Sequence, residues 1–102
     1  MTDQVANDNA GAEPLSAEVA IVNKRGLHAR ASAKFVETAA RFQSEVTVTK
    51  GDTSVSGRSI MGLMMLAAPL GSAIGLAAEG PDAEDAVKAL LALIAAKFHE
   101  DA

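Results

Sequence analysis

A hairpin signal in the middle of the sequence constrains the fold more than any other feature. Residues 45–50 (EVTVTK) alternate between apolar and polar side chains and are rich in β-branched residues, which favours a strand with one buried face. Gly51-Asp52 is a turn signal, and the short run 53–56 (TSVS) predicts the returning strand. Any sheet that this chain forms therefore has to contain an antiparallel pair.

Two more strands and three helices are predicted around this hairpin. The strands show the same alternation, and the first and last helices carry apolar residues three or four positions apart. Ser59 and Asp82 are suitable N-caps for the second and third helices. In chain order the predictions are a strand at 18–22, a helix at 28–42, the hairpin, a helix at 60–67, a strand at 72–79 and a helix from 83 to 98. The order β-α-β-β-α-β-α predicts an α+β open-faced β-sandwich, in which a four-stranded antiparallel sheet carries three helices on one face.

The composition limits the chain to one small domain. With 102 residues, 49% of them apolar, it can bury one core but not two. Residues 1–16 lack helical and strand periodicity, so they are predicted to be a disordered tail before a domain at 17–102. The absence of cysteine excludes disulfides and thiolate metal sites, and two distant histidines argue against structural zinc.

Charge and hydropathy exclude two kinds of partner. Thirteen acidic against nine basic residues argue against a general nucleic-acid binder, which needs a basic footprint. The sequence has no run of about 20 apolar residues and no secretory signal. We therefore expect a cytoplasmic protein without direct membrane insertion.

Residues 26–30 (GLHAR) place His28 where a loop becomes a helix. The free amides and the dipole of a helix N-terminus make an anion site, and Arg30 adds a planar donor for phosphate oxygens. Lys24 and Arg25 add positive charge just upstream. An imidazole at this point can attack phosphorus through its neutral nitrogen while the helix end and Arg30 hold the phosphoryl oxygens. The alternative is that His28 is only a capping or surface residue.

The segment 59–68 contains no charged residue. Leu63 and Leu66 are predicted to be buried, and Ser59 is predicted to be the N-cap. The residues predicted on a second, partly exposed face are Ile60, Met61 and Met64. Exposed methionines can adapt to several partners, although a fully buried helix with methionine as core filler fits the sequence equally well. The other histidine, His99, is interpreted as a solvated residue without a function.

Two motifs, residues 26–30 and 57–66 (GRSIMGLMML), resemble HPr, the histidine-containing phosphocarrier family of the bacterial phosphoenolpyruvate-dependent phosphotransferase system. The element order and the turn at 77–82 (AAEGPD) support the resemblance, which covers about Ala17 to Phe98. It implies that phospho-enzyme I phosphorylates His28 on Nδ1. The group then passes to a IIA domain of a sugar permease or to a regulatory IIA protein. Such a protein is a carrier rather than a free-standing enzyme, and it uses no cofactor or metal.

The resemblance also implies roles for other residues. Arg30 matches the arginine beside the phosphohistidine, and Ser59 matches the regulatory serine of HPr kinase/phosphorylase. Ala31 stands where the family usually has proline, which leaves the first turn less constrained. The expected partner contacts are Lys24, Arg25, Leu27, Ile60, Met61 and Met64. We expect a monomer.

Two alternative functions are compatible with the sequence. The first is a regulatory interaction module of the nitrogen-related phosphotransferase branch, acting mainly through Ser59 and the methionine-rich face. The second is an RNA- or ligand-binding domain with only fold-level similarity, although net acidity and few aromatic residues argue against it.

Overall fold

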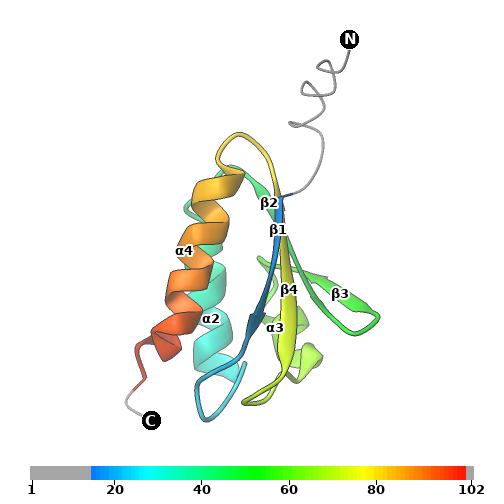
Figure 1. Cartoon of the computed structure of the whole chain (residues 1–102), viewed down its shortest axis with the longest axis vertical. Coiled ribbons are helices and arrows are strands. Elements are labelled where there is room, and N and C mark those ends of the chain that lie inside the picture. Colours follow the sequence, from blue (N-terminus) through cyan, green and yellow to red (C-terminus); the bar gives the residue numbers. More distant parts are fainter. Residues whose placement is uncertain (1–14, 101–102) are drawn as a thin grey trace.

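The computed structural model describes residues 15–100, which form one four-stranded antiparallel sheet with three α-helices. The strands lie in the order β1 (Leu15–Ala20), β4 (Ala73–Glu79), β2 (Glu45–Lys50) and β3 (Thr53–Ser56). The helices are α2 (Ala29–Ala39), α3 (Ile60–Leu66) and α4 (Ala83–Ala95), and a short 3-10 turn, η1 (Lys97–His99), follows α4. Figure 1 shows α2 and α4 side by side along one face of the sheet. The predicted fold class and element order are confirmed.

A single core lies between the sheet and the helices. The inward-facing residues of β4 are Ile74, Leu76 and Ala78, as their alternation predicts. Every helix contributes to the same cluster, for example Phe35 from α2, Leu63 from α3 and Leu90 from α4; the buried apolar residues of all these elements form one contact network. Because one core joins all the elements, the helix ends and loops at one edge of the sheet are held in fixed positions.

The folded domain begins earlier than the sequence pattern predicts. Residues 1–14 of the predicted tail lie outside the described residues, but Leu15 and Ser16 belong to β1, so the predicted boundary at residue 17 is wrong by two residues. Leu15 pairs with Ala78 and Ser16 with Ala77, which extends the ladder with β4. Both residues are exposed, so their place in the sheet depends on backbone pairing and leaves no hydrophobic pattern.

Asp82 occupies the N-cap of α4 without capping it. Its carboxylate accepts hydrogen bonds from the backbone amide of Gln43 (3.0 Å) and the hydroxyl of Ser44 (2.6 Å) instead. The Ser44 hydroxyl, followed by the Gln43 amide, lowers the pKa of Asp82 below its ordinary value. The predicted capping role is therefore wrong, because the carboxylate connects the start of α4 to the loop before β2.

The chain after α4 turns back toward α2. The predicted last helix ends at Ala95, and Lys97, Phe98 and His99 then have positive φ angles of 58°, 55° and 60°. This conformation is unfavourable for residues with a Cβ, but it buries the Phe98 ring completely in the core. The Lys34 ammonium of α2 also donates to the Phe98 carbonyl at 2.7 Å. The turn therefore brings the residues that follow it close to the start of α2.

Candidate functional site

His28 is the N-cap residue of α2, at the end of a loop that is packed tightly against the connection between α3 and β4. Gly26 has φ +65°, and the Leu27 amide donates to the Ala68 carbonyl at 3.0 Å. Leu27 is only 4% exposed and belongs to the core, although it also lines the depression beside His28, so its role as a partner contact stays a prediction. Its burial fixes the loop that carries His28.

The His28 side chain does not cap its own helix. It accepts no hydrogen bond from the first turn of α2, and that turn contains no acidic residue. The side chain is 19% exposed, so the ring is neither sealed in the core nor free in solvent. The amides of the first turn therefore retain the positive potential that attracts anions.

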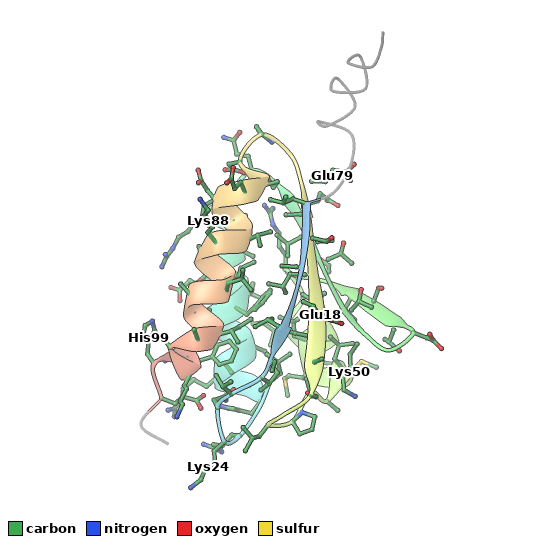
Figure 2. The ribbon with its side chains drawn as sticks, in the orientation of Figure 1. Glu18, Lys24, Lys50, Glu79, Lys88 and His99 are labelled. Atoms are coloured by element: carbon green, nitrogen blue, oxygen red, sulfur yellow. The ribbon has the colours of Figure 1, made fainter. Side chains whose placement is uncertain are left out.

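Of the three predicted basic residues near this helix end, one lines a depression beside His28. Lys24, Arg25 and Arg30 are all exposed. An open depression of about 250 Å³ brings Arg25, Leu27 and His28 together with residues 67–69 of the connection after α3. Neither Arg30 nor Lys24 lines this depression; Lys24 lies in the loop before it (Figure 2). The site thus combines a part-exposed imidazole, a helix N-terminus and long, exposed basic side chains nearby in the sequence.

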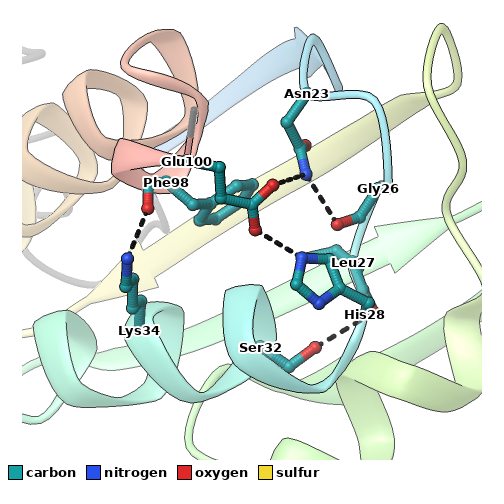
Figure 3. Close-up of polar contacts among 8 residues, drawn as sticks. All are labelled: Asn23, Gly26, Leu27, His28, Ser32, Lys34, Phe98 and Glu100. Carbon is teal, nitrogen blue, oxygen red and sulfur yellow. Dashed lines mark hydrogen bonds and ion pairs between the residues drawn. The ribbon is translucent and has the colours of Figure 1, made fainter. Parts of the chain in front are cut away.

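An acidic residue that the sequence pattern does not single out contacts His28 directly. The Glu100 carboxylate is hydrogen-bonded to Nε2 of His28 and also accepts from Nδ2 of Asn23 at 3.1 Å (Figure 3). Burial opposes ionisation of Glu100, but the hydrogen bonds from His28 and Asn23 outweigh it and lower the pKa of the carboxyl. The sequence indicates positive surroundings for His28; the structure adds a carboxylate on one side of the ring.

Ser59 is the N-cap of α3, as predicted. Its hydroxyl oxygen accepts from the Gly62 amide at 2.9 Å, and the side chain is partly exposed. Leu63 and Leu66 are buried, whereas the opposite side of α3 faces solvent. The large exposed apolar side chains of this region, named here the α3 apolar surface, are Ile60, Met61, Met64, Met65 and Leu70.

This exposure decides between the two interpretations of the methionines. Met61 is 69% exposed and Met65 is 76% exposed, so neither is core filler. The sequence pattern does not predict Met65 or Leu70 as part of the surface, because a short helix with one buried stripe leaves their direction open. Residues 67–69, which follow α3, also line the depression beside His28, so the apolar surface and the imidazole belong to neighbouring parts of the structure.

His99 does not line the depression beside His28. It is exposed and lines a separate hollow of about 430 Å³ between α2 and α4, whose lining does not include His28. Within residues 15–100, no group of three potential metal ligands is close enough to hold an ion. No helix in this part of the chain is long and apolar enough to cross a membrane.

The fold and the site together define a small α+β protein with a part-exposed histidine at a helix N-terminus, a position suited to an anion. The family described as the PTS HPr component phosphorylation site matches residues 15–96. The phosphocarrier protein HPr of Neisseria meningitidis serogroup A is 55% identical over 86 residues, which are 84% of this chain and 97% of that protein. The phosphocarrier protein NPr of Shewanella violacea is 43% identical over 84% of this chain and 94% of its own length.

A solved structure of an HPr protein has the same fold. The crystal structure of HPr-C-His from Thermoanaerobacter tengcongensis superposes with a TM-score of 0.82 and 45% identity, covering 86% of this chain and 99% of that one. The chain belongs to the HPr family, the phosphocarrier proteins of the phosphotransferase system.

Proposed function

We propose that this protein accepts a phosphoryl group on Nδ1 of His28 from phospho-enzyme I and passes it to a IIA domain or protein. The observation that carries the proposal is the position of His28, which is the N-cap of α2, is partly exposed and leaves the first-turn amides uncapped. On acceptance, the Nδ1–phosphorus bond forms as the phosphorus–nitrogen bond of the donor breaks. On transfer, the Nδ1–phosphorus bond breaks as a nucleophile of the acceptor bonds to phosphorus. No further reactant is consumed.

The negative phosphoryl oxygens can be stabilised by the N-terminus of α2 and by two arginines. The amides at the start of α2 can donate hydrogen bonds to these oxygens. So can the guanidinium of Arg30, the second residue of the helix. Arg25 lines the same depression as His28 and adds to the positive potential. The exposed side chains can follow the phosphoryl group as it arrives and leaves, and this suits a carrier that must hold the group without burying it.

The α3 apolar surface is the proposed docking site for donor and acceptor in turn. Its methionines are exposed and unbranched, so they can pack against differently shaped partners. Because this surface and the depression at His28 meet at residues 67–69, a protein that docks on α3 also reaches the imidazole.

Ser59 is the proposed regulatory phosphorylation site, modified by HPr kinase/phosphorylase where that enzyme is present. A phosphate at an N-cap is favoured by the helix dipole, so α3 should persist after modification. The added negative charge would lie beside the α3 apolar surface and oppose docking of partners that bury it.

The test is phosphorylation by phosphoenolpyruvate and enzyme I. Wild-type protein should acquire acid-labile phosphate, and His28→Ala should acquire none. His99→Ala is the matched control, since His99 is exposed and lies outside the depression, and it should be labelled like the wild type. Equal labelling of wild type and His28→Ala would refute the proposal.

Membership of the nitrogen-related branch is a second candidate function, favoured by the 43% identity to a phosphocarrier protein NPr. In that case Ser59 and the α3 apolar surface act as a regulatory interaction module. Ser59→Asp would then change partner binding, while His28→Ala would leave the physiological output intact. Loss of the output in His28→Ala would exclude this alternative.

A further inference from the structure

The carboxylate of Glu100 is held in a defined position by its neighbours. Phe98, two residues earlier, is fully buried, and its carbonyl accepts from the Lys34 ammonium. Nδ2 of the buried Asn23 donates both to Oε1 of Glu100 and to the Gly26 carbonyl, at 3.1 and 2.9 Å. As Figure 3 shows, Glu100 thus bridges the loop before α2 and the His28 ring.

The direction of these hydrogen bonds determines where the imidazole carries its hydrogen. The Asn23 amide can only donate through Nδ2, and an ionised carboxylate can only accept. Glu100 is 9% exposed, but its hydrogen bonds keep its pKa below the ordinary value, so it is ionised at neutral pH. Nε2 of His28 must therefore be the protonated nitrogen of the neutral ring, and Nδ1 must carry the free electron pair.

We infer that Glu100 is a positioning residue that keeps His28 in the Nε2–H tautomer and so keeps Nδ1 nucleophilic. The inference rests on the proposed phosphorylation of His28. When Nδ1 bonds to phosphorus, the ring becomes cationic and retains its Nε2 hydrogen, and this cation faces the Glu100 carboxylate. When the phosphoryl group leaves, the Nδ1–phosphorus pair returns to the ring, which departs as neutral imidazole. No proton has to be exchanged in either direction.

Glu100→Gln separates this role from simple packing. With Asn23 still donating to the carbonyl oxygen of the new amide, the NH₂ group would face Nε2 of His28 and donate to it. Nε2 would become an acceptor, and the ring hydrogen would move to Nδ1. Glu100→Gln should therefore slow phosphoryl transfer more than Glu100→Ala, which removes the preference for the Nε2–H tautomer without reversing it. A purely structural role predicts the opposite order, because glutamine preserves the shape.

The first measurement is the nitrogen NMR spectrum of the His28 ring in unphosphorylated protein at about pH 8, where free histidine is neutral. Wild type should show the Nε2–H form, Glu100→Ala a mixture, and Glu100→Gln mainly the Nδ1–H form. Glu18→Gln is the control, because Glu18 is an exposed carboxylate on β1, and it should match the wild type. An unchanged tautomer in both Glu100 variants overturns the inference.

The second measurement is the initial rate of phosphoryl transfer from phospho-enzyme I. Glu100→Gln should be slower than wild type by about tenfold or more, the size expected from one charge-assisted hydrogen bond, and Glu100→Ala should fall between them. If Glu100→Ala does not fold, Glu100→Gln alone decides, since a wild-type rate in that variant contradicts the inference. If the wild-type protein is not labelled at His28, the proposed function is refuted. The tautomer of His28 can still be measured in that case, so the two failures are distinguishable.

Discussion

The close approach of Gly26 to the chain after α3 leads to a quantitative prediction. A Cβ at position 26 would lie 2.3 Å from the Ala68 carbonyl oxygen and 2.9 Å from Cα of Pro69. Both contacts are with backbone atoms, which cannot move aside as a flexible side chain can. The Ala68 carbonyl also accepts a hydrogen bond from the amide of Leu27, the residue before His28, so the clash would disturb this bond.

Gly51→Ala provides the matched control for Gly26→Ala. Gly51 also has a left-handed backbone, with φ +60° against +65°, but a Cβ there would meet no atom within 4 Å. A left-handed alanine costs about 1–2 kcal/mol, and the lower entropy of the unfolded alanine chain offsets part of this. Gly51→Ala should therefore lower the free energy of unfolding by about 1 kcal/mol.

Gly26→Ala should cost clearly more. It adds the loss of one backbone hydrogen bond, about 1 kcal/mol, and an overpacking penalty of about 1–3 kcal/mol. The expected decrease is about 3–5 kcal/mol, measured by urea unfolding of both variants with the same buffer and probe. The variant should also be phosphorylated more slowly, since the displaced segments line the depression beside His28. Equal losses of stability in the two variants would refute the reasoning from close approach.

Three further predictions concern a cap, a surface and an acid-sensitive contact. Ser59→Ala should lower the free energy of unfolding by about 1 kcal/mol through loss of the hydrogen bond from the Gly62 amide. Ser59→Asp keeps a capping oxygen and should retain most of the wild-type stability, and urea unfolding checks both variants. Met64→Lys should weaken binding to both enzyme I and the IIA acceptor by about fivefold or more in calorimetry, and unchanged affinity for both would contradict a shared surface. Because the pKa of Asp82 is lowered in the folded state, its contribution is present above the ordinary value of 3.8 and is lost as the pH falls through the folded value. Asp82→Asn should therefore be less stable than wild type at pH 7, and the difference in free energy of unfolding should narrow as the pH falls below 3.8, measured by urea unfolding.

Local patterns in the sequence were sufficient for the architecture. The alternation in β2 and β4 and the apolar spacing in α2 and α4 report burial directly, since a residue's face follows from its position in the period. Ser59 could be placed at the start of α3 because capping depends only on the next few residues. Likewise, His28 could be placed at a helix N-terminus because that boundary is a local change of period.

Contacts between distant segments could not be obtained in this way. Asp82 is a good local cap, but Ser44 and Gln43 compete for its carboxylate, and they approach it only in the folded chain. Leu27 looks like a surface residue beside a motif, yet the packing against Ala68 buries it.

What the sequence determined by itself is the set of elements, their order and the histidine at the start of α2, because each depends on neighbours a few residues away. The contacts of that histidine depend instead on the packing of distant segments. Glu100 is 72 residues from His28 along the chain and reaches it through a left-handed turn that no apolar period encodes. That turn forms because burial of Phe98 offsets its unfavourable backbone, and burial of this kind exists only once the core has assembled.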